Sequence, residues 1–444
     1  MLGLTGSFEA CLDQAIADLG GAAVEVPPRI PASQERRRGV KPEDYSNLGA
    51  VSLIDDDGLL RWVYEPPPGR SGRRRARRRA VPSIDGTPIR TIPIQDLPSN
   101  EILDAIAALD KRLTPNQGLR IWRNGALGPL PAQQIKAKRV LLLIHGTFSK
   151  SDMFFEELGA TAEGKAYLAA AEGEYGEILA FDHPTLAVSP WINALDLEAA
   201  LAGVTGRIDV VCHSRGGLVT AWWLRLAKRD VDNVVFVGSP LVGTSLASPA
   251  ALRQALDHLA TAARGIAAAS GAASTVLPFM SVVTGLAKVL GKVLQLGADL
   301  PVADLAVVTV PGLAAQSRVS NNAELLRLFS TPWPSGPRLR AVISNFKPRE
   351  VDAGWHFWRR LTNVGDQVKF GAANLVFDAP NDLVVDTGCM IGPGTDSRAA
   401  PGGAALHELA FTDVDIIQFE NSPVVHHTNY FVQPRTVGAL RTLL

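Results

Sequence analysis

Between residue 139 and residue 444, short uninterrupted apolar runs alternate with longer stretches of helical character. Strands of a parallel sheet have continuous apolar runs because both of their faces are covered, and helices typically connect such strands. The pattern therefore predicts an α/β fold with a mostly parallel central sheet. The predicted strands are residues 140–144, 178–181, 208–212, 234–237, 339–344 and 416–419.

Residues 1–135 have a different pattern, in which short apolar runs are broken by Pro, Gly and charged residues. Two β-type runs, 50–54 and 59–64, flank an Asp-Asp-Asp-Gly segment, which predicts a hairpin. A chain of 444 residues is longer than one hydrophobic core usually organises. We therefore expect a smaller N-terminal region over 1–135, whose role the sequence does not indicate, and a larger domain over 136–444.

An arginine-rich block extends from Arg70 to Arg79. Its like charges repel one another and it has no apolar periodicity, so we expect an exposed loop. The chain has as many Lys and Arg residues as Asp and Glu residues, 44 of each kind. This balance excludes a positive electrostatic field over the whole protein that would attract nucleic acid. No aromatic residues interleave with the block, so we expect no nucleic-acid partner, whereas contact with an anionic lipid surface stays open.

Only three cysteines are present, Cys11, Cys212 and Cys389. They are too few for a disulfide framework and lack metal-ligand spacing, and the eight histidines show no cluster with them. The first residues have no basic start, and Glu9 and Asp13 follow early, which argues against a cleaved secretory signal. We expect a cytoplasmic protein without a metal or cofactor, with peripheral membrane contact as an alternative.

Ser214 stands at the apex of a predicted strand, turn and helix, in the segment Cys212-His-Ser-Arg-Gly-Gly. A nucleophilic serine on such a turn needs small residues two positions before and after it, because the strand and the helix crowd each other there. Gly216 meets this need, and Cys212 replaces the usual first glycine with another small residue. Ser214 is therefore the candidate nucleophile.

A serine nucleophile also needs donors for the oxyanion that forms after attack. His145-Gly-Thr follows the first strong strand directly, where this type of fold places its second donor. The backbone N–H groups of Thr147 and Arg215 are the candidate pair. His145 itself precedes the serine at a strand end, so we expect a hydrogen-bonded scaffold residue rather than a base.

These segments resemble the lipase-like branch of the α/β-hydrolases, which includes bacterial triacylglycerol lipases and GPI-inositol deacylase-like proteins. The resemblance covers residues 139–444. It rests on the segments Leu143-Ile-His-Gly-Thr, Cys212-His-Ser-Arg-Gly-Gly, Val237-Gly-Ser-Pro-Leu-Val-Gly-Thr and Asn381-Asp-Leu-Val-Val. It implies an acyl-enzyme mechanism with the order serine, acid, histidine along the chain.

The resemblance places the catalytic acid at Asp382, with Asp386 as the nearby alternative. It places the base in the pair His426-His427 after the last strand. We prefer His427, because the residues three and four positions later, Tyr430 and Phe431, could pack and fix the following turn, but His426 stays open.

The segment 248–320 is rich in Ala, Leu, Val and Gly and contains an uncharged run over 265–287. We expect a helical lid with an apolar underside rather than a membrane span, because the run has the low hydrophobicity of Ala, Gly and Ser. An apolar lid favours long acyl chains. The sequence thus predicts a serine hydrolase of carboxylic esters, such as a lipase, phospholipase or esterase. Thioesterases and peptidases would use the same residues, and an inactive interaction or lipid-binding module is the alternative.

Overall fold

The computed structural model describes a subset of the chain, which we refer to as the described residues. They are 5–18, 49–56, 59–65, 87–94, 102–131, 134–227, 229–247, 260, 280, 283–285, 287, 310–317, 322–347, 380–392 and 406–444. The chain divides into two compact units. The first comprises Met1–Asp104, Leu252–Ala306 and His356–Asn363, and the second comprises Ala105–Ala251, Val307–Trp355 and Val364–Leu444.

The first unit contains a helix and a small antiparallel sheet. The helix is α1 (Thr5–Asp18), and the strands are β1 (Gly49–Asp56), β2 (Leu59–Glu65) and β3 (Thr87–Ile94), in the order β2-β1-β3. Asp56 pairs with Leu59 across the turn, which confirms the predicted hairpin. Arg90 of β3 donates to both carboxylate oxygens of Asp13 of α1, at 2.7 and 2.9 Å. The block from Arg70 to Arg79 lies outside the described residues.

The second unit is built on an eight-stranded sheet. Its strands are β4 (Gly118–Arg123), β5 (Ala126–Pro129), β6 (Ile135–Ile144), β7 (Glu177–Asp182), β8 (Val204–His213), β9 (Val231–Val237), β10 (Arg338–Phe346) and β11 (Ile416–Ser422). Their spatial order is β11-β10-β9-β8-β6-β7-β4-β5. Strands β6 to β11 are mutually parallel, whereas β4 runs antiparallel to both β7 and β5.

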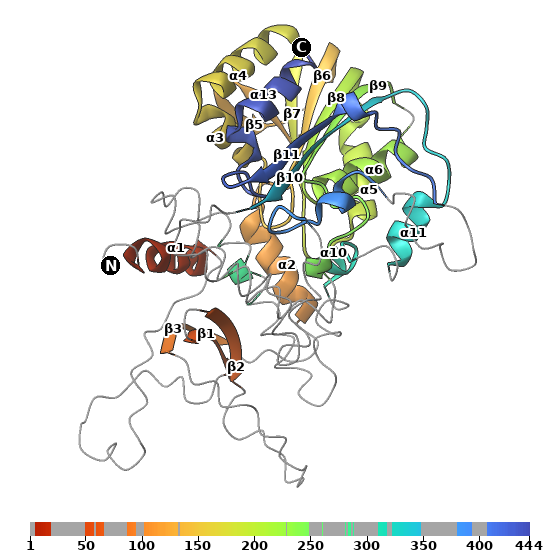
Figure 1. Cartoon of the computed structure of the whole chain (residues 1–444). Helices are drawn as coiled ribbons and strands as arrows, with labels where there is room; N and C mark the ends of the chain where they lie inside the picture. Colours follow the sequence, from red (N-terminus) through yellow and green to blue (C-terminus); the bar gives the residue numbers. More distant parts are fainter. Residues whose placement is uncertain are drawn as a thin grey trace, which may run out of the picture. The chain divides into compact units, whose positions relative to one another are not determined.

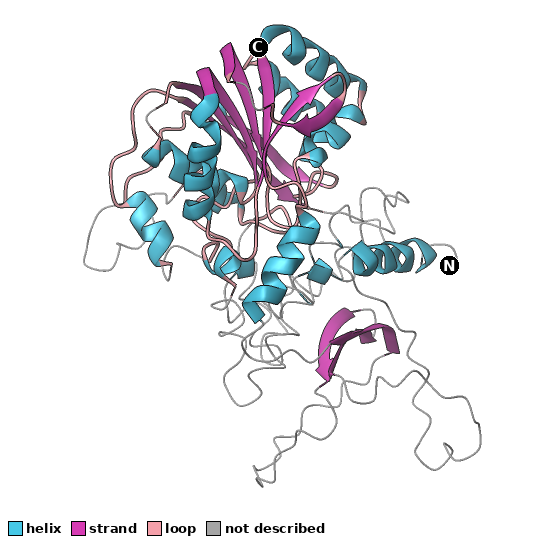
Figure 2. Ribbon diagram, turned by 180° about the vertical axis from the view of Figure 1, so that it is seen from behind, coloured by secondary structure: helices cyan, strands magenta, loops and turns pink. Residues whose placement is uncertain are grey.

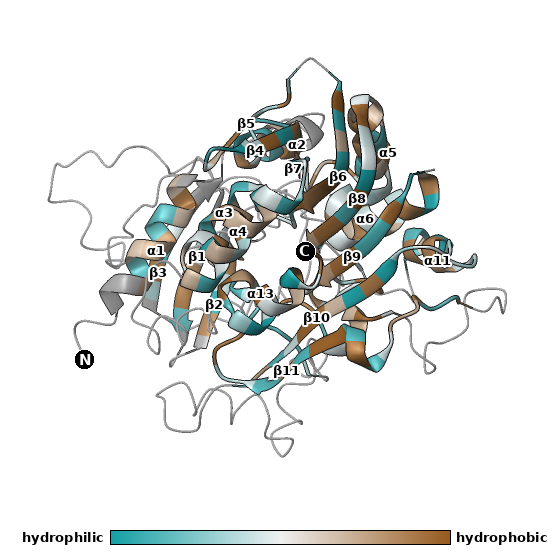
Figure 3. Cartoon of the chain, turned by 90° about the horizontal axis from the view of Figure 1, so that it is seen from above, coloured by the Kyte–Doolittle hydropathy of each residue, from teal (hydrophilic) through white to brown (hydrophobic). Residues whose placement is uncertain are grey.

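Helices cover both faces of this sheet (Figures 1 and 2). On one face, α3 (Asp152–Gly159), α4 (Ala162–Glu174) and α13 (Pro434–Arg441) share an apolar core with the strands. On the other face, α5 (Pro190–Ala200), α6 (Gly216–Leu226) and α11 (Ala323–Phe329) form a second core. Apolar stretches along the central strands, visible in Figure 3, supply the sheet side of both cores. Two further helices are α2 (Ile102–Leu113) and α10 (Pro311–Ala314).

The predicted α/β fold with a mostly parallel sheet is confirmed, and all six predicted strands lie within β6 to β11. Strands β4 and β5 were not predicted. β4 alternates partly exposed and buried positions and carries two arginines, so it lacks the continuous apolar run that marks the central strands. Both strands precede the predicted boundary at residue 135 but are hydrogen-bonded into the large sheet, so the second unit begins earlier in the sequence than we expected.

The strand order reverses direction between β6 and β8. From β6 the chain continues to β7 on one side, and β8 then pairs with β6 on the other side. In open parallel sheets, ligands bind beyond the carboxyl ends of the strands at such a switch point. The loops after Ile144 and after His213 therefore meet at the expected position of a binding site.

Most of the predicted lid, 248–320, lies outside the described residues, as does most of the uncharged run 265–287. Of the helices that the structure describes, none combines the length and the apolar character needed to cross a bilayer.

Candidate active site

Ser214 lies between the end of β8 and the start of α6, in a backbone conformation that non-glycine residues rarely adopt. Its φ is +52°, in the left-handed region. Its backbone N–H donates to the carbonyl of Val237 at 2.9 Å, and its carbonyl accepts from the N–H of Gly217 at 2.9 Å. A residue in this region costs about 1–3 kcal/mol and persists only where the surroundings enforce it. Because β8 leads directly into α6, the turn presents the serine side chain at the carboxyl edge of the sheet.

The close approach of β6 to the turn explains the small residues around Ser214. A Cβ on Gly216 would lie 2.2 Å from the carbonyl oxygen of Ile144, so no larger residue fits without moving backbone. Cys212 is fully buried, and its thiol donates to the carbonyl of Val235 at 3.5 Å. Burial raises the pKa of this thiol to about 12, which keeps it protonated. Cys212 is therefore a small packed residue at the position where related motifs have glycine.

His427 joins Ser214 to Asp382. Its Nε2 lies 2.8 Å from Ser214 Oγ, and its Nδ1 lies 2.8 Å from Asp382 Oδ2. A carboxylate can only accept, so Nδ1 carries the proton and Nε2 is free to accept the serine hydroxyl. The three residues come from three separate parts of the chain, and the structure brings them together in one hydrogen-bonded line.

The neighbouring His426 has different surroundings. Its Nδ1 lies 3.2 Å from the hydroxyl of Thr428, and its ring packs against Phe346 with a centroid separation of 6.1 Å. Burial lowers the pKa of His426 to about 4. Of the two candidates that the sequence left open, His427 is the one that contacts Ser214.

Asp382 is completely buried, and its carboxylate accepts four hydrogen bonds. Oδ1 accepts from the N–H groups of Val384 at 3.0 Å and Val385 at 2.8 Å, and Oδ2 accepts from His427 and from the Tyr430 hydroxyl at 2.9 Å. Burial raises the pKa of Asp382, but the charge of His427 and the bonds from His427, Val385 and Val384 outweigh it and lower the pKa overall. The carboxylate is thus held ionised at a fixed orientation.

The alternative acid, Asp386, serves a different part of the structure. Its Oδ2 accepts from the backbone N–H of Ser245 at 3.1 Å and from the hydroxyl of Ser245 at 2.9 Å. Ser245 begins the 3₁₀ turn Ser245–Ala247, so Asp386 stabilises the loop after β9.

The loop after β6 lies against Ser214, as the oxyanion-hole prediction requires. A Cβ on Gly146 would lie 2.6 Å from Ser214 Cβ and 3.2 Å from Ser214 Oγ. Within the described part of the chain, the backbone N–H groups of Thr147 and Arg215 have no hydrogen-bond acceptor. The N–H of Arg215 also belongs to the amino-terminal end of α6, where the helix dipole favours negative charge. Neither N–H group is therefore bonded to another described group.

The side chain of Arg215 is fully buried and points away from this role. It donates to the carbonyl of Val188 and, at 2.8 Å, to the side-chain oxygen of Asn193 on α5. Burial lowers the pKa of Arg215 to about 10, and the carboxylates of Asp110 and Glu324 act in the opposite direction. The guanidinium therefore connects the start of α6 to α5 and the loop before it.

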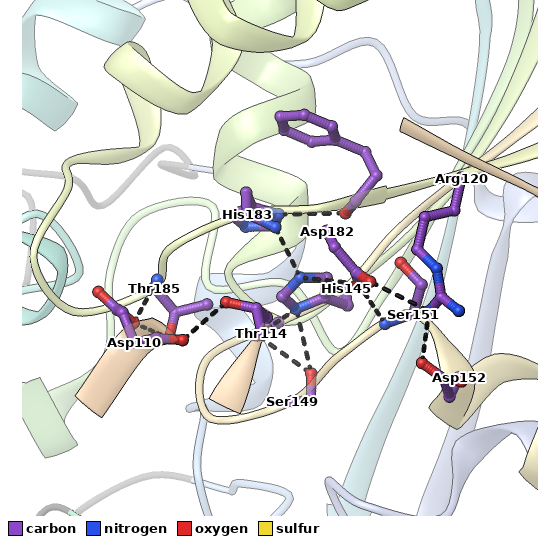
Figure 4. A network of polar contacts seen from close by, with 12 residues as sticks. Asp110, Thr114, Arg120, His145, Ser149, Ser151, Asp152, Asp182, His183 and Thr185 are labelled. Carbon is purple, nitrogen blue, oxygen red and sulfur yellow. Dashed lines mark hydrogen bonds and ion pairs between the residues drawn. The ribbon is translucent and has the colours of Figure 1, made fainter. Parts of the chain in front are cut away.

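His145 supports the same loop from below (Figure 4). Its Nδ1 donates to the carbonyl of Gly146 at 2.9 Å, and its Nε2 accepts the backbone N–H of His183 at 3.1 Å. The two imidazoles stack with their centroids 4.2 Å apart. Burial lowers the pKa of His145 even though Asp182 lies nearby, so the ring is neutral. These contacts are those of a scaffold residue.

Carboxylates fix the two loops on either side of His145 (Figure 4). Asp182 accepts from the backbone N–H of Ser151 at 2.7 Å, and Arg120 bridges Asp182 and Asp152. Asp110 of α2 accepts the successive N–H groups of residues 185, 186 and 187 at 2.8, 2.9 and 2.6 Å. No sequence pattern indicates Asp110 or Arg120, because both precede residue 135, in the region without a recognisable motif. Their role depends on long-range contacts that no local pattern encodes.

The described residues contain no group of three or more His, Cys, Asp or Glu side chains arranged to hold a metal ion.

The strand order and the strained serine turn after the central strand β8 define an α/β-hydrolase fold. Within this class, the chain belongs to the family described as "Domain of unknown function (DUF7379)", whose model matches residues 112–444. No curated protein matches the sequence.

Three solved structures illustrate what the chain is similar to. The lipase BlEst2 of Bacillus licheniformis in its mature form is 14% identical over 71% of this chain and 94% of its own, with a TM-score of 0.32. Lipase 1 of Pelosinus fermentans is 14% identical over 69% and 99%, with a TM-score of 0.36. A thermophilic esterase of Thermogutta terrifontis is 12% identical over 70% and 91%, with a TM-score of 0.34. Because these identities and TM-scores are low, the fold assignment rests on the strand order and not on the similarity to these three structures.

Proposed function

We propose that this protein is a serine hydrolase that cleaves carboxylic esters through an acyl-enzyme on Ser214. The observation that carries the proposal is the continuous line from Ser214 Oγ through His427 to Asp382, with 2.8 Å at each step. A hydroxyl is a weak nucleophile at neutral pH and reacts when an adjacent base accepts its proton. A nucleophile, a base and an orienting acid within hydrogen-bond reach are the arrangement this chemistry requires.

The proposed reaction has two halves. His427 Nε2 takes the Ser214 proton as Oγ bonds to the ester carbonyl carbon, and the resulting imidazolium returns that proton to the alcohol as the carbon–oxygen ester bond breaks. Water then attacks the acyl-enzyme, its proton passes to His427 and on to Ser214 Oγ, and the carboxylic acid leaves. The Asp382 carboxylate holds the tautomer throughout and stabilises the imidazolium in both halves.

The oxyanion of each tetrahedral intermediate would accept from the N–H groups of Thr147 and Arg215. The contact of Gly146 with Ser214 and the position of Arg215 at the start of α6 support this assignment. Such fixed donors act where charge develops and are typically worth a factor of roughly 10²–10³ in kcat each.

The lipid part of the proposal has separate support. Helix α5, which follows the loop held by Asp110 and Arg215, carries three large apolar side chains that are partly exposed: Trp191 at 39%, Ile192 at 37% and Leu195 at 45%. Apolar surface patches are found where proteins meet lipids or other proteins. Together with the apolar composition of 248–320, this favours esters with long acyl chains, which a lipase, phospholipase or esterase would cleave.

The test is labelling with a fluorophosphonate, which transfers its phosphonyl group to an activated serine and releases fluoride. We expect the wild-type protein and His426→Ala to be labelled, and Ser214→Ala and His427→Ala to be unlabelled. Turnover of p-nitrophenyl esters from acetate to palmitate then measures the chain-length preference, with and without detergent.

Labelling that persists in Ser214→Ala would overturn the nucleophile. Folded wild-type protein that is not labelled in any of these conditions would instead favour an inactive interaction or lipid-binding module. Preference for acetate over longer esters would leave the serine hydrolase in place and reject the lipid substrate.

A further inference from the structure

Tyr430 contacts the same carboxylate oxygen as His427. Its hydroxyl lies 2.9 Å from Asp382 Oδ2, and His427 Nδ1 lies 2.8 Å from that atom. Tyr430 is completely buried and begins the 3₁₀ turn Tyr430–Val432, three residues after His427. From the sequence we expected Tyr430 only to pack and fix the turn after His427.

We propose that Tyr430 is a positioning residue of the active site, which acts through Asp382 by donating a hydrogen bond to the oxygen that His427 uses. This inference rests on the function proposed above. The carboxylate has about four acceptor sites, and here all four are used. The two backbone donors fix Oδ1. Among the described residues, the Tyr430 hydroxyl is the one side-chain donor besides His427 that determines how Oδ2 is oriented and how much negative charge it presents.

Towards Asp382 the hydroxyl can only act as a donor, because a carboxylate oxygen accepts. Burial, then the charge of Asp382, raises the pKa of Tyr430 well above its ordinary value, so the proton stays on the phenol throughout the working pH range. Little space surrounds the contact: a Cβ on Gly238 would lie 2.7 Å from the Tyr430 ring, 3.3 Å from Asp382 Oδ2 and 3.4 Å from His427 Nδ1. The ring therefore cannot turn its hydroxyl elsewhere without displacing the loop after β9.

Two other titratable groups near the pair, His213 and His426, do not duplicate this effect. His213, at the end of β8, donates from Nε2 to the carbonyl of His427 at 2.9 Å, and burial lowers its pKa to about 3. His426 is neutral for the same reason, with a pKa of about 4. Both rings are therefore uncharged above about pH 5, so they contribute no titration near neutrality.

The Tyr430 hydroxyl affects both the charge and the rotation of the Asp382 carboxylate. A donor to Oδ2 withdraws charge from the carboxylate and so reduces its stabilisation of the His427 imidazolium. Without the hydroxyl, the carboxylate stabilises the imidazolium more strongly, so the imidazolium persists to a higher pH. The acid limb of the pH–activity profile therefore moves to higher pH. The same change frees the carboxylate to rotate, which lowers the fraction of enzyme in the reactive geometry.

The test compares Tyr430→Phe with two matched controls. Tyr175→Phe removes another buried tyrosine–aspartate bond of the same length, from the Tyr175 hydroxyl to Asp209 Oδ2 at 2.9 Å. Tyr167→Phe removes a buried hydroxyl that has no hydrogen-bond partner in the part of the chain that the structure describes. In Tyr430→Phe we expect kcat for a p-nitrophenyl ester to fall about tenfold with KM unchanged, and the acid limb of kcat/KM to move up by about half a pH unit. Both controls should retain the wild-type kcat and pH profile.

A second measurement does not depend on turnover. The His427 Nδ1 proton should give a downfield proton resonance, which should move in Tyr430→Phe and stay in place in Tyr175→Phe. Substitution of Tyr430 by 3-fluorotyrosine strengthens the donor at nearly constant volume and should move the acid limb down instead.

An unchanged pH profile and an unchanged resonance in Tyr430→Phe would overturn the positioning role. A resonance that shifts in a protein that no fluorophosphonate labels would uphold the contact and reject the hydrolase. The two proposals therefore fail in different ways.

Discussion

Two buried histidines lie in segments that pack against Ser214, and they differ in what their ring nitrogens contact. His427 has the Asp382 carboxylate at Nδ1 and the Ser214 hydroxyl at Nε2. His145 has the backbone carbonyl of Gly146 at Nδ1, 2.9 Å away, and the backbone N–H of His183 at Nε2, while the Ser149 hydroxyl and the Asp182 carboxylate lie farther from its ring nitrogens, at 3.4 and 3.6 Å. Backbone groups do not titrate, so they fix His145 in one neutral tautomer. At His427, by contrast, the Ser214 hydroxyl can give up its proton, and the Asp382 carboxylate can stabilise the positive charge that this proton brings to the ring. The contacts of the ring, rather than the residue type, separate a base from a scaffold.

The largest expected effect comes from removing the base. His427→Ala should reduce kcat by up to about a millionfold, because the members of a triad act as a unit. His145→Ala is the comparison, and its kcat should fall by only about tenfold to a hundredfold, because the serine and the base stay in contact. Single-turnover measurements with an activated ester distinguish the two. Comparable losses in both variants would contradict the separation of roles.

The second effect concerns the acid. Asp382→Asn should lower kcat by about ten-thousandfold, because an amide permits the wrong imidazole tautomer. Asp386→Asn is the matched control four residues later, and it should keep kcat within a few-fold while lowering the melting temperature, since it weakens the bonds to Ser245. Steady-state kinetics and thermal unfolding of the two variants check this. A larger kinetic loss in Asp386→Asn would exchange their roles.

The third effect is structural and belongs to His145. His145→Ala leaves the buried N–H of His183 and the carbonyl of Gly146 without their partner, which should lower the free energy of unfolding by about 2–4 kcal/mol. We expect kcat to fall by about tenfold to a hundredfold as the Thr147 N–H loses its fixed position. Urea unfolding and kcat are the measurements. Unchanged stability would show that the Figure 4 network does not hold the loop.

The remaining expected effect is the pH dependence of the free energy of unfolding. Burial lowers the pKa of His145, His183, His213 and His426, so the folded protein keeps them neutral where the unfolded chain takes up protons. Their stabilisation is present above pH 6.5 and is lost as the pH falls below it, by about 1.4 kcal/mol per pH unit for each group. Glu157 has the opposite sign: burial raises its pKa to about 8, so its contribution is lost as the pH rises from 4.5 to 8. Four groups outweigh one, and urea unfolding from pH 7 to pH 5 should show falling stability. His145→Ala should reduce the slope of the free energy of unfolding against pH by about 1.4 kcal/mol per pH unit, because one protonating group is removed.

Several parts of the site could be predicted because local sequence encodes them. A strand, a serine and a glycine two residues later are adjacent in the chain, and the crowding that selects Gly216 acts over those few residues. The central strands could be predicted because burial on both faces requires continuous apolar runs. β4 could not, since its position beside β7 comes from tertiary pairing and leaves only an alternating pattern.

The sequence by itself determined the α/β fold, the six parallel strands and the strained turn at Ser214, because these follow from hydrophobic periodicity and from short-range steric limits. Only the tertiary structure shows that His427, and not His426, contacts Ser214, and that Asp382, and not Asp386, contacts His427, because the members of each pair are at most four residues apart but face different partners. It also decided the roles of Asp110 and Tyr430, whose carboxylate and hydroxyl act on atoms 75 and 48 residues away in the chain. Hydrogen bonds depend on distances below about 3.5 Å, and a sequence pattern does not specify such distances between remote segments.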